Sequence, residues 1–341
     1  MAGDPIGSPL FFVLRRAITR HDCFENADQC RDVFLHCNPH KVELNVVVAV
    51  NQLMAHANHV ASGNFRDTRP RGRRPSLLPV IKRLTPRDLR ILEFLYEHRV
   101  FSIDQLSQMF FNSIKIARRR MLILYELGLV DRFELPLVRN SPNHYVLDHL
   151  GARIVAAHRG ISFLELRWHK EDDEALPFQG AFHHLIETNE FFVRLIAACR
   201  RNARHRVNTW WGEKHCASAW NEEVHPDGYA VLEGPYERME FFFELDRGTE
   251  SPSRLRAKLA RYQDIAPLAD CPKVLLFSFL DPEREVAARK HLYNPGMTLA
   301  TTVFDVANAD PFGAVWLPIG SQRRVPQLAL AALRHTPGAS A

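Results

Sequence analysis

The sequence has few cysteines and no long hydrophobic run. Six of its 341 residues are cysteine, which is too few for a disulfide scaffold in a chain of this length. None of the six lies in the close Cys-x2–4-Cys pairs with which zinc sites are usually built. The longest aliphatic run, residues 46–50, is far short of the roughly 20 apolar residues that span a bilayer. The apolar patch at residues 8–14 lacks the features of a secretory signal, so we expect a cytoplasmic protein without membrane contact.

Several common catalytic patterns are also missing. The chain contains no P-loop, no Rossmann glycine pattern and no His-Glu-x-x-His helix. It also has no tyrosine near a histidine cluster of the kind that rolling-circle relaxases use. A nucleotide hydrolase and a tyrosine relaxase are therefore not favoured. With 46% hydrophobic and 24% charged residues, the composition is that of a folded chain rather than a disordered or collagen-like one.

The two signs of charge are separated along the chain. Residues 65–120 contain 14 lysines and arginines against 5 acidic residues, a net charge of +9, whereas the whole chain carries +5. Residues 221–250 contain 9 acidic residues against two arginines, a net charge of −7. Phosphate backbones attract a basic segment, and an acidic segment either holds a metal ion or forms a solvated surface. The separation indicates two different functions in one chain.

We expect an α+β fold of two domains. Residues 81–160 form the first domain and residues 176–320 the second, with an acidic linker at residues 171–174 between them. An N-terminal extension and basic linker cover residues 1–80, and residues 321–341 are a tail. In the second domain the predicted order is a helix, three strands, a helix, a strand, a helix and two short strands, which gives a mixed sheet flanked by helices.

Capping residues predict a winged helix-turn-helix in the first domain. Thr85, Ser102 and Ser113 are good N-caps for three successive helices, and Gly128 ends the third of them. Two strand-like runs within residues 129–147 then predict a β-hairpin, which would be the wing. In such domains the third helix enters the major groove of DNA. The alternative is a winged helix that contacts only proteins.

The third helix, residues 114–127, divides into apolar and basic positions. We expect its apolar side chains to face the core; these are Ile116, Leu122, Ile123, Tyr125 and Leu127. The basic side chains are then left for solvent or DNA; these are Lys115, Arg118, Arg119 and Arg120.

Glycine, proline and arginine recur through residues 61–79, which predicts a flexible basic linker. Arg71, Arg73 and Arg74 in this linker are expected to contact DNA phosphates or the minor groove, without preference for base sequence. A solvated charge run is the alternative interpretation.

Three carboxylates are expected to converge in the second domain. Glu244 and Asp246 are two residues apart on a predicted strand, so their side chains point to the same face, and Asp227 begins the preceding strand. Oxygen ligands of this kind suit Mg²⁺ or Mn²⁺, and such an ion could polarise a phosphodiester and activate water. Lys258 on the next helix could reach back toward the carboxylates. The alternative is that Asp246 forms a salt bridge with a nearby arginine and that no metal binds.

This arrangement resembles the PD-(D/E)xK nucleases, whose fold is restriction-endonuclease-like. The resemblance implies catalytic roles for Asp227, Glu244 and Asp246, although Asp246 stands where the family has its lysine. Some members supply that lysine from the following helix, which makes Lys258 the candidate here. Glu187 matches the position of an auxiliary acid on the first helix.

Residues 84–317 also resemble the replication-relaxation family of plasmids and mobile elements. The similarity rests on the winged helix and on several groups of residues: His184 with Glu187 and Asn189, Trp211 with Glu213, Pro226-Asp227-Gly228, the Glu-Leu-Asp-Arg-Gly-Thr block at residues 244–249, and Lys258 with Tyr262. It implies a role in plasmid replication initiation and DNA relaxation. We expect double-stranded DNA as the partner, with a homodimer as one assembly. Two hypotheses follow. The chain either binds DNA and nicks it with a metal ion, or it is a non-enzymatic regulator with a degenerate nuclease-like domain.

Overall fold

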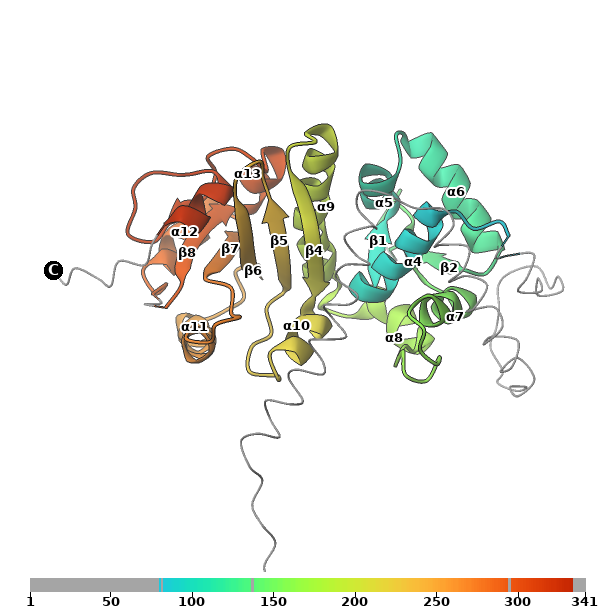
Figure 1. Cartoon of the computed structure of the whole chain (residues 1–341), viewed down its shortest axis with the longest axis horizontal. Coiled ribbons are helices and arrows are strands. Elements are labelled where there is room, and N and C mark those ends of the chain that lie inside the picture. The colour runs from blue at the N-terminus through green and yellow to red at the C-terminus, as the bar shows by residue number, and fades with distance from the viewer. Residues whose placement is uncertain (1–79, 81, 136–137, 294–295, 334–341) are drawn as a thin grey trace, which may run out of the picture. The chain divides into compact units, whose positions relative to one another are not determined.

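The computed structural model describes residues 80, 82–135, 138–293 and 296–333, all of which belong to one compact unit, residues 49–341. The predicted N-terminal extension, the linker arginines Arg71, Arg73 and Arg74, and the end of the predicted tail lie outside the described residues. None of the described helices is long and apolar enough to cross a membrane. The described residues form an α+β structure with two sheets (Figure 1).

The first part is a small helical unit with a three-stranded antiparallel sheet in the order β1-β3-β2. Its elements are α4 (Pro86–His98), β1 (Val100–Ser102), α5 (Ile103–Phe110), α6 (Ile114–Glu126), β2 (Val130–Phe133), β3 (His144–Leu147) and α7 (His149–His158). The three predicted N-caps are confirmed. The side chains of Thr85 and Ser102 form capping boxes, and that of Ser113 accepts a hydrogen bond from the Ile116 N–H.

The predicted core face of α6 is partly wrong. Ile116 and Leu122 are 51% and 41% exposed, whereas Ala117, Met121 and Leu124 are buried. These buried residues are spaced by four and three positions, which is the repeat of one helix face. Ile116 and Leu122 are each one residue away from this row, so the helix turns their side chains outward.

A short helical segment follows the helical unit. It comprises α8 (Lys170–Glu174) and the 3-10 turn η1 (Leu176–Phe178). The predicted acidic linker at residues 171–174 is therefore a helical turn, and one of its acids, Asp173, is buried. Asp173 accepts hydrogen bonds from Arg99 Nε (3.2 Å) and Trp168 Nε1 (2.9 Å). These partners explain why an acidic residue packs here instead of lying in solvent.

The second part is a six-stranded mixed sheet in the order β4-β5-β6-β7-β8-β9, in which β6, β7 and β8 are parallel. Its strands are β4 (Arg206–Gly212), β5 (Gly228–Glu233), β6 (Arg238–Asp246), β7 (Val274–Phe279), β8 (Thr298–Val303) and β9 (Leu317–Pro318). Its helices are α9 (Phe182–Arg201), α10 (Glu213–Ala219), α11 (Pro252–Ile265), α12 (Pro282–Arg289), α13 (Phe304–Ala309) and the 3-10 helix η2 (Gln327–Ala332).

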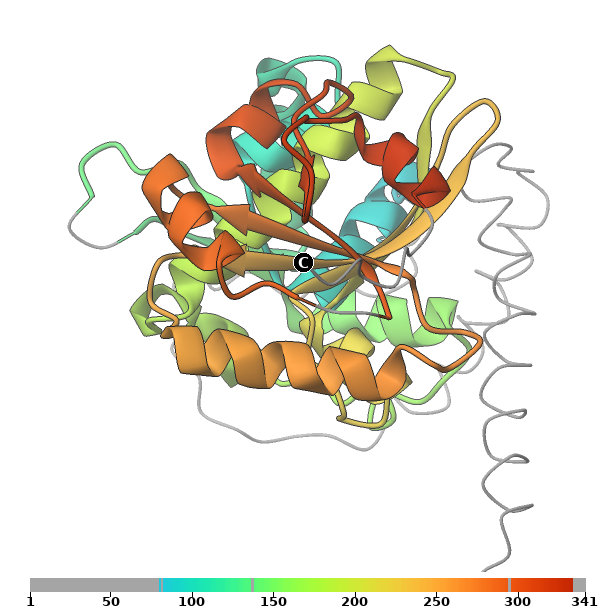
Figure 2. The same cartoon turned by 90° about the vertical axis from the view of Figure 1, so that its left-hand side faces the viewer.

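Alternating residues of β6 pack against helices on opposite faces of the sheet. Phe243 stacks on Phe191 of α9 with ring centroids 4.0 Å apart, whereas Phe242 shares a buried cluster with Leu259 and Tyr262 of α11. Figure 2 shows α11 on one side of the sheet and α9 on the other. Because successive side chains of a strand point to opposite faces, the even-numbered residues of β6 all face α11.

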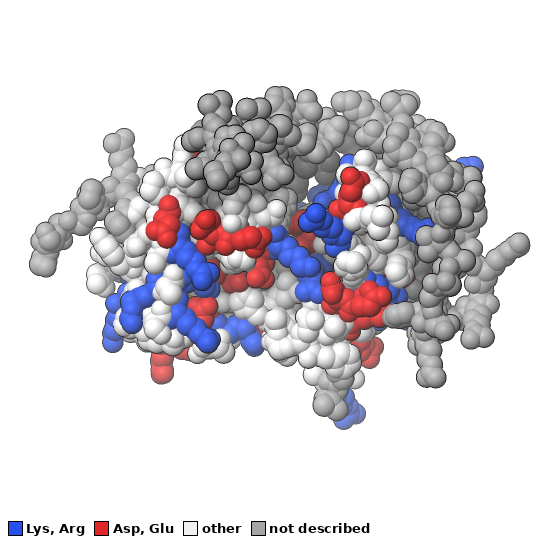
Figure 3. Space-filling model, turned by 90° about the horizontal axis from the view of Figure 1, so that it is seen from below, with Lys and Arg blue, Asp and Glu red and all other residues white. Residues whose placement is uncertain are grey.

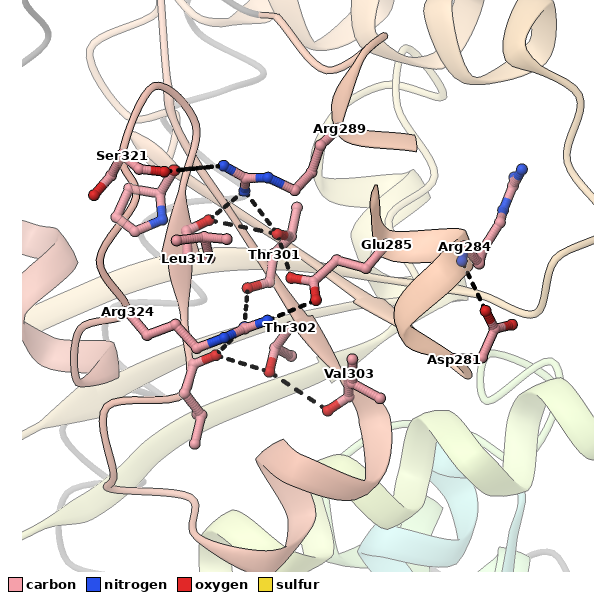
Figure 4. A network of polar contacts seen from close by, with 12 residues as sticks. Asp281, Arg284, Glu285, Arg289, Thr301, Thr302, Val303, Leu317, Ser321 and Arg324 are labelled. Carbon is pink, nitrogen blue, oxygen red and sulfur yellow. Dashed lines mark hydrogen bonds and ion pairs between the residues drawn. The ribbon is translucent and has the colours of Figure 1, made fainter. Parts of the chain in front are cut away.

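A buried polar network holds the far edge of this sheet (Figure 4). Glu285 of α12 accepts hydrogen bonds from Thr301 Oγ1 (2.6 Å) and from Arg324 (2.7 Å). Arg289 donates to Thr301 Oγ1 (2.8 Å) and to the carbonyl oxygen of Leu317 (2.7 Å). These hydrogen bonds connect the short strand β9 and the segment after it to α12 and β8.

Candidate functional site

Two groups of charged side chains stand out, and the first is the exposed face of α6. Lys115, Arg118 and Arg119 are exposed on this helix, and none of them forms an ion pair with an acidic side chain in the described part of the chain. Ser113 caps the helix, so its first turn is held in place. The structure thus brings three of the four predicted α6 cations together on an open surface.

Arg120, the fourth predicted DNA-binding residue of α6, points elsewhere. Its Nε donates to Asp88 Oδ1 (2.8 Å), and its Nη2 donates to the other Asp88 oxygen and to the Arg83 carbonyl (2.9 Å). Asp88 is fully buried and also accepts the Thr85 N–H (2.7 Å) within the α4 capping box. The hydrogen bond to Asp88 raises the pKa of Arg120. Arg120 therefore neutralises a buried carboxylate between α6 and α4, which corrects its assignment to the DNA-binding face.

The second group lies at the carboxyl end of β6. Glu244, 1% exposed, shares the face of Phe242 and so points toward α11. Its two oxygens accept from Tyr262 Oη (2.6 Å) and from Lys258 Nζ (2.9 Å). Burial raises the pKa of Glu244 to about 7, with a further contribution from the nearby Asp227 charge that Lys258 opposes. The predicted approach of Lys258 to this strand is confirmed.

Asp227, just before β5, lies beside Glu244. Its Oδ2 accepts the Leu245 N–H (2.7 Å), and its Oδ1 lies 2.8 Å from His184 Nε2 of α9. Burial alone would raise the pKa of Asp227, but His184 and Lys258 together hold it below its ordinary value. Burial opposes protonation of His184, yet its hydrogen bond to Asp227 raises the pKa of the imidazole. Asp227, Glu244 and Lys258 therefore form one electrostatic group, with His184 at its edge.

Asp246 does not join this group. Its carboxylate accepts from Arg284 Nη2 of α12 (2.6 Å) and from the Gly248 N–H (2.6 Å). Arg284 also donates to the Glu250 carbonyl (2.6 Å), and the Glu250 carboxylate lies 2.9 Å from Lys258 Nζ. In the described ranges no three His, Cys, Asp or Glu side chains form a group that could hold a metal ion. Two of the three predicted carboxylates, Asp227 and Glu244, thus lie together, whereas the third, Asp246, pairs with Arg284.

Glu187, the predicted auxiliary acid, lies on α9 and pairs with Arg247, whose Nε is 2.7 Å from Glu187 Oε2. His184 is one of the residues on which the family resemblance rests, but its contact with Asp227, 43 residues away, was not predicted. Arg284 was not predicted at all, because its partner Asp246 is 38 residues away along the chain. One signal was present for His184: it precedes Glu187 by three residues and so lies on the same side of α9.

The surface on the side of α11 carries mixed charge. Figure 3, taken from the side of α11, shows acidic and basic side chains interleaved instead of separated into patches of one sign. The exposed residues of α11 contribute Arg254, Arg256 and Arg261 to this surface. This face of the molecule therefore carries cations as well as carboxylates.

Comparison with known proteins adds one finding. Residues 92–274, just over half of the chain, match the family described as Replication-relaxation. The match begins within α4 and ends at the start of β7, so it includes α6, Asp227, Glu244 and Lys258. No curated protein and no solved structure matches the chain.

Proposed function

Because the chain belongs to the replication-relaxation family, we propose that it binds double-stranded DNA and acts in the replication of a plasmid or another mobile element. The observation that carries this proposal is the exposed face of α6, on which Lys115, Arg118 and Arg119 have no acidic partner among the described residues. The helical unit is then a winged helix-turn-helix, α6 is its recognition helix, and the β2–β3 hairpin is its wing.

The physical basis is the attraction between unpaired cations and the DNA backbone. A helix fits the major groove of B-form DNA, and each lysine or arginine that neutralises a phosphate releases a counterion. Arg132 and Arg139, on the exposed side of the hairpin, add positive charge to the proposed wing. The cations of α6 and of the wing would therefore contact the same duplex.

Duplex binding tests this proposal. The affinity of the protein for labelled DNA should fall when Arg118 and Arg119 are both replaced by alanine. Lys290→Ala with Arg323→Ala is the matched control, because it removes the same charge from exposed positions in the second part of the chain. Equal affinity of the α6 variant and the control would contradict the proposal.

A second candidate activity is metal-dependent nicking of DNA, supported by the proximity of Asp227, Glu244 and Lys258 at one end of the six-stranded mixed sheet. Mg²⁺ commonly takes one or two carboxylates together with waters and phosphate oxygens, so Asp227 and Glu244 suffice in number. Their four oxygens already accept contacts from His184, Leu245, Tyr262 and Lys258. A bound Mg²⁺ or Mn²⁺ would require one of these contacts to be released.

When bound, such an ion would polarise a phosphodiester and lower the pKa of a water molecule. The residues of the chain have separate tasks in this proposal. Asp227 and Glu244 would hold the ion, Lys258 would stabilise the negative charge that develops on the phosphate, and Tyr262 would keep Glu244 oriented. Glu187 is held by Arg247 and would act only if that ion pair opened.

Conversion of supercoiled plasmid to nicked circles in Mg²⁺ or Mn²⁺ tests this activity. Asp227→Asn and Glu244→Gln should each abolish nicking, and Asp264→Asn, at an exposed position of α11, should retain it. DNA binding without nicking in the wild type would instead support the non-enzymatic regulator, in which the sheet domain serves only as a scaffold or a partner site.

A further inference from the structure

The exposed face of α6 contains apolar side chains among its cations. Ile116 and Leu122 are 51% and 41% exposed, and both lie beside Arg118 or Arg119 at helical spacing. Single exposed apolar residues are common on protein surfaces, so exposure alone indicates nothing. Both, however, lie on the proposed recognition helix, where their partner would be DNA.

Ile116 lies in the first turn of α6, two residues after the helix begins at Ile114. In helix-turn-helix proteins the N-terminal residues of the recognition helix contact the edges of the bases. Leu122 lies six residues further along, more than two turns into the helix. Of the two exposed apolar side chains, Ile116 is therefore the one placed to reach bases.

The side chains of α6 limit which DNA bases this face can recognise. From residue 114 to residue 122, α6 has no Asn, Gln, Asp or Glu. Adenine is usually recognised by Asn or Gln and cytosine by Asp or Glu, whereas guanine is recognised by Arg or Lys and the thymine methyl group by apolar side chains. The chemistry of α6 therefore suits guanine and thymine.

We propose that Ile116 contacts the C5-methyl group of a thymine in the major groove, so that it determines sequence preference while Arg118 and Arg119 bind phosphate. This inference rests on the proposed function, in which α6 is the recognition helix. The net positive charge around Ile116 favours DNA over an apolar protein partner, because Lys115, Arg118 and Arg119 have no acidic partner in the described part of the chain.

The test replaces thymine by deoxyuridine, which removes only the methyl group. Preferred sequences are first selected from random duplexes with the full-length protein, and each thymine is then replaced in turn. At one or two positions the wild type should bind about fourfold more weakly, the amount expected when one methyl group is no longer buried. Ile116→Ala should bind the thymine and deoxyuridine duplexes equally. Leu122→Ala and Val306→Ala, the latter at an exposed position of α13, should keep the fourfold difference.

Each other outcome overturns the inference in a distinguishable way. If the wild type selects a sequence but is indifferent to deoxyuridine everywhere, no methyl group is recognised. If Leu122→Ala abolishes the difference and Ile116→Ala does not, the assignment to Ile116 is wrong. If the protein binds duplexes without selecting a sequence, Ile116 determines no preference although the proposed function survives. If it binds no duplex while folded, the proposed function itself fails.

Discussion

Replacing Arg120 by alanine should destabilise the fold, in contrast to replacing its neighbour Arg119. The guanidinium of Arg120 donates two hydrogen bonds to Asp88, whose side chain is completely buried at the junction of α4 and α6. Truncation would leave that carboxylate without its positive partner. Arg119 is exposed and has no such contact among the described residues, so it is a matched control on the same helix.

The magnitude follows from the burial of the pair. Removing one partner of a buried ion pair costs about 3–5 kcal/mol, because the other charge remains desolvated. The Arg120 side chain is 19% exposed, so water can enter the vacated position, and we expect about 3 kcal/mol. Arg119→Ala should change the free energy of unfolding by less than about 0.5 kcal/mol, as is usual for surface positions.

Urea denaturation followed by circular dichroism measures both variants. The midpoint for Arg120→Ala should fall while the slope of the transition stays the same, since the change affects stability rather than the surface exposed on unfolding. Asp88→Asn, which removes the charge but keeps an oxygen for the α4 capping box, should recover about 1–2 kcal/mol when added to Arg120→Ala. A loss below about 0.5 kcal/mol in Arg120→Ala would refute the structural role of this arginine.

Three further predictions concern other parts of the chain. Deletion of residues 66–74 should weaken binding equally for a selected site and for random DNA, whereas a loss confined to the selected site would contradict a contact that is independent of base sequence. Burial lowers the pKa of His98 to about 3. Below about pH 6.5 the unfolded chain therefore binds a proton at this residue that the folded chain does not bind. Stability should therefore be complete above about pH 6.5 and should fall by about 2 kcal/mol at pH 5; urea unfolding of His98→Phe should show a correspondingly smaller pH dependence, and an unchanged one would argue against this residue. Mn²⁺ should raise the melting temperature of the wild type but not that of Asp227→Asn or Glu244→Gln, and the absence of a shift in the wild type would exclude the metal site.

The order of secondary structure in the helical unit was predictable because its boundaries are local. Thr85, Ser102 and Ser113 each satisfy backbone N–H groups within three residues, so the sequence alone carries the signal. The orientation of α6 was harder to predict. Its apolar residues occupy more than one face, and only packing against α5 and β2 selects the row from Ala117 to Leu124. Helix α10 was missed because its seven residues give no clear apolar period.

The part of the candidate site that depends on adjacent strands and the helix after them was predictable. Asp227 and Glu244 meet because β5 and β6 are adjacent and antiparallel, and Lys258 lies on the helix that directly follows β6. The partner of Asp246 was not predictable in the same way. Arg284 reaches it only because β7 lies parallel to β6 and α12 begins just beyond the end of β7. Such a contact depends on the order of strands in the sheet, which spacing in the sequence does not give.

The most direct test of the central claim, that α6 binds the DNA backbone, is the salt dependence of duplex affinity. The slope of log K against log salt concentration should be shallower by about 1.8 in the Arg118→Ala and Arg119→Ala double variant than in the wild type, since each phosphate contact contributes about 0.9. Lys290→Ala with Arg323→Ala should leave the wild-type slope unchanged. An unchanged slope in the α6 variant would contradict the account.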